Sequence, residues 1–196
     1  MGERRTFQPL TAQDRVAVLL YRTGIVLSAI VVAASAYFFG MRYNELAPAI
    51  DLLVYCLYIS VGLSVFFIHL YVSAFKRFLI KIYAASLICL VTLLLIGKGS
   101  IFDAFSRSPY VFLLLLPLSG CLGFVTAKEA FCFRLIEGYL LAMLMPAYVI
   151  FAAVGAASAK ALYYGLWVIA AMLVLFTLRK VFMPIAYDIG DKTAYH

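Results

Sequence analysis

The sequence is poor in charged residues. Only 13% of its 196 residues are charged, whereas 66% are hydrophobic. A soluble domain has roughly 25% charged and roughly 45–50% apolar residues. A water-soluble fold of this length has too little interior to bury so many apolar side chains. The composition therefore excludes a soluble globular protein and indicates a polytopic membrane protein.

Residues that bind metals are equally scarce. The chain has two histidines, and its four cysteines (Cys56, Cys89, Cys121 and Cys132) form no C-x-x-C pair. Because scattered cysteines within apolar runs behave as small hydrophobic residues, we expect neither a disulfide framework nor a zinc site. The second histidine is the last residue of the sequence, which excludes a haem held by two histidines.

Enzyme signatures are missing as well. There is no H-E-x-x-H motif and no glycine-rich phosphate loop. Six-span rhomboid proteases need a serine in a G-x-S motif and a histidine in the last span, but Ser119 follows Pro117 and Leu118, and the last apolar run has no histidine. We therefore expect no enzymatic activity, no cofactor and no metal.

The N-terminal 14 residues are polar and mixed in charge, so we expect no cleavable signal. Their fit to the myristoylation pattern is treated as a coincidence, because a protein with several spans gains little from one weak acyl anchor. Thr11 and Asp14 have the spacing of a capping box, which predicts a helix that starts near Ala12 and continues to Met41.

Long apolar runs are what the chain does contain. Six of them are long enough to cross a hydrocarbon core of about 30 Å at about 1.5 Å per residue. They are Gly24–Met41, Leu52–Phe75, Phe78–Gly97, Tyr110–Ala127, Leu140–Ala159 and Ala161–Leu178. The predicted fold is an all-α transmembrane bundle of six spans over residues 24–178. Residues 1–23 form a cytoplasmic or interfacial helix start, and residues 179–196 form a cytoplasmic tail. Pro117 and Pro146 are expected to kink the fourth and fifth helices.

The basic residues predict how this bundle is oriented. Of the 16 lysines and arginines, all but Arg42, Lys98, Arg107 and Lys160 fall on one side of the predicted spans. By the positive-inside rule, both termini are then cytoplasmic. The basic residues flank apolar runs instead of forming a stripe, so the +7 net charge does not indicate binding to nucleic acid. Membrane lipid is the expected surrounding.

The stretch Gly120–Glu137 brings charged residues of both signs into a few positions and joins the fourth and fifth runs in a tight hairpin on the cytoplasmic side. Gly120 and Gly123 are expected to let a neighbouring helix approach closely. Arg134 lies three residues before Glu137, which predicts an ion pair in the first turn of the fifth helix.

Four charged residues make this stretch a candidate site: Lys128, Glu129, Arg134 and Glu137. Three interpretations remain open, namely a structural ion-pair turn, a ligand or substrate site, and an ordinary solvated turn. His69 is the other candidate. It lies inside the second predicted span, about 10 Å from its cytoplasmic end. An ionisable residue there is either functional or a neutral imidazole bonded to a neighbouring helix.

Several short pieces resemble an uncharacterised integral membrane protein family of cyanobacteria, plastids and some other bacteria, a six-span domain of unknown function. They are Asp14-Arg15, Tyr21-Arg22, Ile68-His69-Leu70-Tyr71, Lys128-Glu129-Ala130-Phe131-Cys132-Phe133, Leu178-Arg179-Lys180-Val181 and Asp188-Ile189-Gly190-Asp191-Lys192. The resemblance implies a six-span protein of a bacterial plasma membrane or a thylakoid membrane. It also implies an accessory role, with the other proteins of a membrane complex, such as a photosynthetic one, as partners.

Three functions are therefore consistent with the sequence. The first is a non-enzymatic accessory or assembly factor for a larger membrane complex. The second is a small-molecule or ion transporter, although the runs lack the buried polar residues that line substrate pathways. The third is a pigment- or haem-binding protein that uses His69 as its one histidine ligand.

Overall fold

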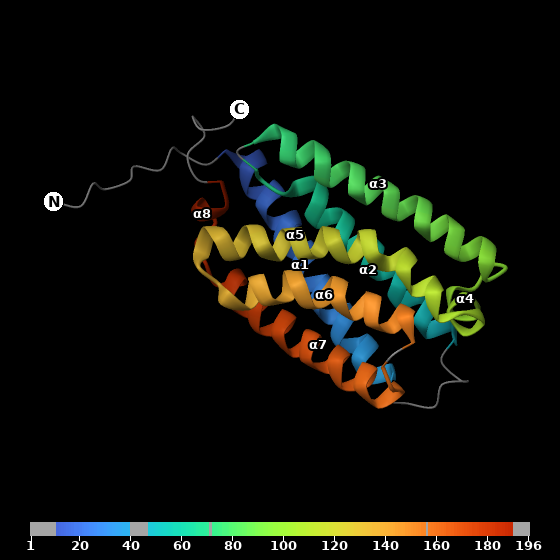
Figure 1. The fold of residues 1–196 in the computed structure, drawn as a ribbon. Helices are drawn as coiled ribbons and strands as arrows, with labels where there is room; N and C mark the ends of the chain where they lie inside the picture. The colour runs from blue at the N-terminus through green and yellow to red at the C-terminus, as the bar shows by residue number, and fades with distance from the viewer. Residues whose placement is uncertain (1–10, 40–46, 71, 156, 190–196) are drawn as a thin grey trace.

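A computed structural model describes residues 11–39, 47–70, 72–155 and 157–189 of the chain. Every regular element in these ranges is helical, and six helices are long and apolar enough to span a membrane, which confirms the predicted all-α, six-span fold (Figure 1). The elements are α1 (Ala12–Phe39), α2 (Ala47–Phe67), α3 (Ser73–Ile96), α4 (Ile101–Arg107), the 3₁₀ helix η2 (Pro109–Leu115), α5 (Leu116–Phe133), α6 (Ile136–Val154), α7 (Ala159–Val181) and α8 (Ala186–Ile189).

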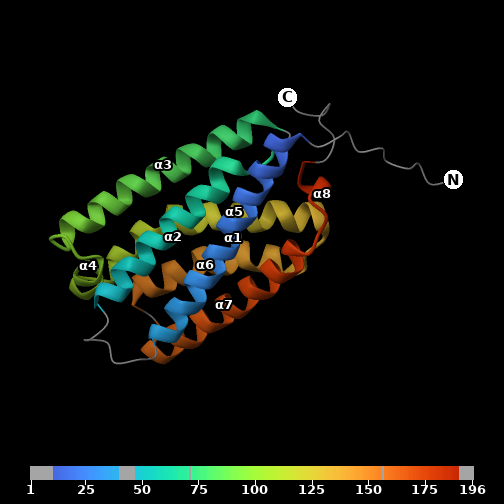
Figure 2. The same cartoon turned by 180° about the vertical axis from the view of Figure 1, so that it is seen from behind.

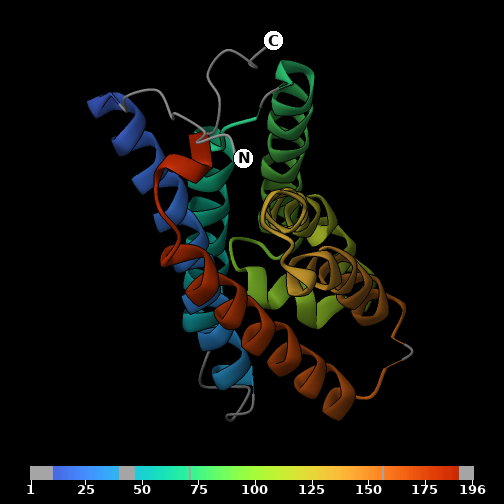
Figure 3. The same ribbon diagram turned by 90° about the vertical axis from the view of Figure 1, so that its left-hand side faces the viewer.

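The spanning helices pack in two groups of three. In the first group α1 lies between α2 and α7, and in the second α5 lies against α3 and α6. Figures 2 and 3 show the two groups from behind and from the side, and α6 packs against α7 to join them. One hydrophobic core contains buried residues from all six spanning helices.

The first helix begins as its sequence predicts. The Thr11 backbone N–H donates to Asp14 Oδ2 at 2.9 Å, and the Asp14 N–H donates to Thr11 Oγ1 at 3.2 Å, which completes the capping box. Farther along α1, Gly24 lets α2 approach. A Cβ placed there would lie 2.4 Å from Ser64 Oγ and 2.6 Å from the Ser60 carbonyl oxygen. The absence of a side chain at Gly24 therefore permits the close packing of α1 on α2.

Two predicted helices differ from those in the structure. The second was expected to reach Phe75, but α2 ends at Phe67, and α3 begins at Ser73. The intervening Ile68 is fully buried, so this turn is as apolar as the helices beside it, and hydropathy does not reveal it. His69 therefore lies in the α2–α3 connection, and its predicted position inside a span is wrong.

The fourth predicted helix has two parts. It starts as the 3₁₀ helix η2 and continues as α5, so Pro117 falls in the first turn of α5 and not in the middle of a helix. A proline there lacks only an N–H that has no helical acceptor, so no helix kink is needed at this position. Pro146 does lie inside α6.

Candidate functional site

Charged and polar side chains gather at one end of the bundle. There α1 begins, α5 and α7 end, and α8 follows, as the left side of Figure 1 shows. We call these six side chains the charge cluster: Tyr21, Arg22, Lys128, Glu129, Lys180 and Asp188. They come from four different helices, so the cluster forms only when the whole bundle is folded.

Glu129 of α5 is at the centre of the charge cluster and is completely buried. Its Oε1 accepts hydrogen bonds from Tyr21 Oη and Lys128 Nζ, both at 2.7 Å. Its Oε2 forms an ion pair with Lys180 of α7. A buried carboxylate is tolerated only when it is paired and hydrogen-bonded, and these three donors meet that requirement.

Lys180 is also completely buried, although it carries a charge in an apolar bundle. Its Nζ pairs with Glu129 of α5 and with Asp188 of α8. The same ammonium group lies 4.0 Å from the centre of the Phe133 ring, a distance that allows a cation–π interaction. Lys180 therefore ties the last spanning helix to both α5 and α8.

Arg22 holds the end of the described chain against α1. Its Nε donates to Asp188 Oδ2 at 2.7 Å. Its Nη1 donates to the carbonyl oxygens of Val181 (3.0 Å) and Met183 (2.7 Å), and its Nη2 donates to that of Pro184 (3.2 Å). The last carbonyl groups of a helix have no N–H donor within the helix, and the guanidinium supplies one to Val181 at the end of α7. The side chain of Arg22 is therefore buried between α1 and the segment that follows α7.

The structure divides the four charged residues of the predicted Gly120–Glu137 site. Lys128 and Glu129 belong to the charge cluster. Glu137 lies in the first turn of α6, as expected, but it pairs with Arg179 of α7 at 2.7 Å. Arg134 is exposed and has a left-handed backbone (φ 54°) where α5 ends. The predicted Arg134–Glu137 pair is wrong, because Arg134 lies in the turn and does not share a helix face with Glu137.

The two glycines of this hairpin also differ. A Cβ at Gly123 would lie 3.2 Å from the carbonyl oxygen of Ala142, so Gly123 permits a close approach of α5 and α6, as predicted. A Cβ at Gly120 would meet nothing within 4 Å. The expectation of a close neighbour is therefore wrong for Gly120, which borders open space.

His69 is half-buried in the α2–α3 connection. Its Nδ1 is buried and has no hydrogen-bond partner among the residues that the structure describes. Burial lowers the pKa of the imidazole below its usual value, and the positive charges of Lys76 and Lys128 lower it further. His69 is therefore neutral at pH 7, which is the form that can ligate a metal or accept a hydrogen bond.

Sequence reasoning missed four members of the charge cluster: Tyr21, Arg22, Lys180 and Asp188. Arg22 and Lys180 were used only as markers of orientation. A signal was nevertheless present, because the short pieces that carry the family resemblance contain all four residues. Pieces far apart in the sequence thus meet at one end of the bundle.

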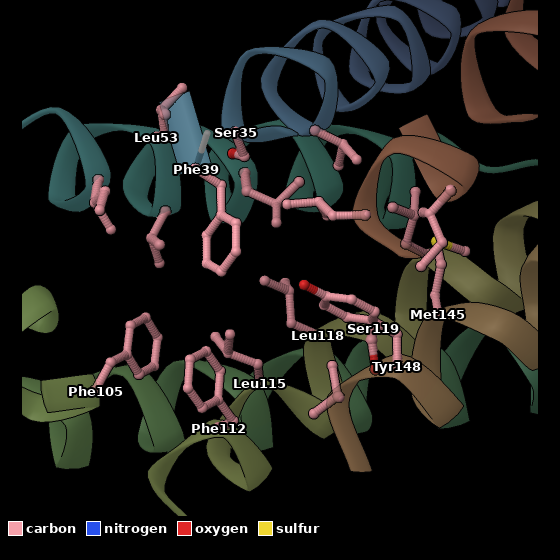
Figure 4. Close-up of a pocket in the computed structure, with 18 of the residues that line it drawn as sticks. Ser35, Phe39, Leu53, Phe105, Phe112, Leu115, Leu118, Ser119, Met145 and Tyr148 are labelled. Carbon is pink, nitrogen blue, oxygen red and sulfur yellow. The ribbon is translucent and has the colours of Figure 1, made fainter. Parts of the chain in front are cut away.

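A cavity of about 220 Å³ lies toward the opposite end of the helices (Figure 4). Its wall comes from α1, α2, α4, η2, α5, α6 and α7, and almost all of its atoms are apolar. Ser35, Ser119 and Tyr148 carry the hydroxyl groups in this wall. Within the described ranges, no group of three or more His, Cys, Asp or Glu residues could hold a metal ion.

Six apolar helices of spanning length define a multi-pass integral membrane protein. The chain belongs to the uncharacterised integral membrane protein family DUF2301, whose family model matches residues 63–196. This confirms the family resemblance found in the sequence. Neither a curated protein nor a solved structure matches the chain.

Proposed function

We propose that this chain is a non-enzymatic accessory protein that binds another protein within the membrane. The observation that supports this proposal is that the charge cluster is occupied internally. Glu129 and Lys180 are completely buried, and each already has two or more charged or hydroxyl partners. The ion pairs and hydrogen bonds of the cluster link four helices, so its charged residues stabilise the fold.

The same arrangement argues against catalysis at the charge cluster. A general acid or base must come within hydrogen-bond reach of the substrate. Reaching Glu129 or Lys180 would require the removal of a partner helix, because α1, α5, α7 and α8 surround them. For this reason we also propose that the chain has no catalytic centre at this end of the bundle.

The outer surface beside the charge cluster offers contacts for a partner. Phe131 is 79% exposed and Phe182 is 83% exposed, and Ile136 is also exposed. They lie where α5 and α7 end and α6 begins, and Arg134 lies in the turn between α5 and α6. Aromatic residues and arginine are enriched at protein interfaces, so this group is the surface that we propose for the partner.

Photo-crosslinking in native membranes tests this function. A benzophenone amino acid at Phe182 should give one protein adduct of defined mass. The control is the same residue at Leu95 of α3, which is 75% exposed at the opposite end and should give lipid adducts. If both positions give only lipid adducts, the proposed partner surface is refuted.

Pigment or haem binding is a second candidate, because the buried Nδ1 of His69 has no partner among the described residues. A visible absorption band of the protein purified in mild detergent, lost in the variant His69→Leu, would favour it over the accessory role. Transport is supported less well, because the cavity wall has few polar atoms for a substrate path.

A further inference from the structure

The cavity between the helices has aromatic rings on two of its sides. Phe39 of α1 extends into it from one side, and Phe105 and Phe112 face it from the other (Figure 4). The rings of Phe105 and Phe112 are stacked, with centroids 4.4 Å apart and planes 5° apart. Two facing aromatic walls favour a flat occupant, because flat rings gain most from stacked and edge contacts.

The hydroxyl groups of the cavity are not equivalent. Ser35 Oγ donates to the Val31 carbonyl oxygen, and Ser119 Oγ donates to the Leu116 carbonyl oxygen, both at 2.8 Å. The donor capacity of both serines is therefore used within their own helices. Tyr148 Oη points into the cavity and makes no hydrogen bond to any described residue (Figure 4). It is the available hydrogen-bond donor of this wall.

From these observations we propose that the cavity binds a flat, uncharged ring system that carries a carbonyl oxygen, with Tyr148 as the hydrogen-bond donor. The wall residues include no charged side chain, which excludes an ionic ligand. This ligand site is separate from the proposed partner surface and does not depend on it.

The size of the cavity limits the ligand. A dry apolar cavity of about 150 Å³ takes one benzene ring. A volume of about 220 Å³ is therefore suited to two or three fused rings. A lipid acyl chain is the main competitor, because it fits the apolar wall but leaves the Tyr148 hydroxyl unpaired.

Two probes of the same shape separate these occupants. 9-Fluorenone carries a carbonyl oxygen, and fluorene is the matched hydrocarbon without it. We expect saturable binding of fluorenone to the full chain in lipid nanodiscs, about tenfold tighter than fluorene, which is the gain from one hydrogen bond of ordinary strength. Empty nanodiscs give the background from partition into lipid.

The variants assign the binding to the cavity. Tyr148→Phe keeps the ring and should weaken fluorenone binding about tenfold while leaving fluorene unchanged. Leu53→Trp fills the cavity and should abolish the binding of both probes. Leu52→Trp is its control, because Leu52 is 62% exposed on the same helix and lies outside the cavity wall. Leu122→Phe replaces Leu53→Trp if that variant does not fold.

Two results would overturn the proposal. Equal affinity for fluorenone and fluorene in the unmodified protein would show that the cavity accepts any apolar molecule, such as an acyl chain. Binding that survives both filling variants would place the probes outside the cavity. Thermal unfolding without ligand checks that each variant is folded.

Discussion

Replacing Glu129 with glutamine should destabilise the protein strongly. The side chain keeps its shape, but the charge opposite Lys128 and Lys180 is lost. Removing one partner of a buried ion pair costs about 3–5 kcal/mol, because an uncompensated charge stays in the interior. Lys180 retains Asp188, and the Lys128 side chain is slightly exposed, so we expect the lower end of this range, about 3 kcal/mol.

Glu137→Gln is the matched control on the same hairpin. Glu137 also forms an ion pair at 2.7 Å, but the side chain of its partner Arg179 is 51% exposed. Water can solvate that guanidinium when the pair is broken. The cost should therefore lie within about 0–1 kcal/mol, as for pairs at the surface.

A double-mutant cycle completes this test. The variant Glu129→Gln/Lys180→Met removes a cation together with the carboxylate, so it should be more stable than the sum of its two single changes predicts. The assay is the free energy of unfolding in lipid bicelles, measured on all variants under one condition. Small and equal losses for Glu129→Gln and Glu137→Gln, with additive effects in the double variant, would refute a structural role for the buried ion pairs.

Three further predictions concern orientation, protonation and packing. In a chain whose native cysteines are replaced, a cysteine at Lys160 should react with an impermeant reagent added outside, and one at Thr11 should not; the reverse labelling would contradict the charge bias. Burial lowers the pKa of His69, so the unfolded chain binds a proton at this residue more readily than the folded chain does. The contribution of neutral His69 to the free energy of unfolding is therefore complete above about pH 6.5 and is lost as the pH falls toward the folded pKa. His69→Leu should flatten that part of the profile of unfolding free energy against pH, and an unchanged profile would show that another group is responsible. Gly24→Ala should cost about 1–3 kcal/mol, because its methyl group overlaps the backbone of α2. Gly120→Ala, which meets open space, should cost nothing measurable by thermal unfolding, and equal losses for the two would contradict the packing of α1 on α2.

Local features of the sequence predicted most of the fold. The six apolar runs of spanning length can be identified without knowledge of tertiary contacts. The capping box of Thr11 and Asp14 is also a local feature, because it lies within four residues. The same holds for Glu137, whose position in the first turn of α6 was expected because the helix dipole favours a carboxylate there. The turn at Ile68 was missed, because a buried apolar turn has the composition of a helix.

The charge cluster could not be assembled from the sequence in this way. Tyr21 and Glu129 are 108 residues apart, and Arg22 and Asp188 are 166 residues apart. Such pairs depend on how α1, α5, α7 and α8 pack, which no periodicity of one segment determines. Arg134 and Glu137 illustrate the converse error, because the three-residue spacing rule fails where a turn separates the two residues.

The most direct test of the accessory role is the size of the particle in which the full chain leaves its native membrane. After extraction in a mild detergent, native gel electrophoresis with mass spectrometry of each band measures that size. We expect the 21.8-kDa chain to migrate with a second membrane protein in a fixed ratio, and Phe182→Ser with Phe131→Ser to release it as a folded monomer. Migration of the unmodified chain by itself, from membranes in which it is folded, would contradict the proposed function.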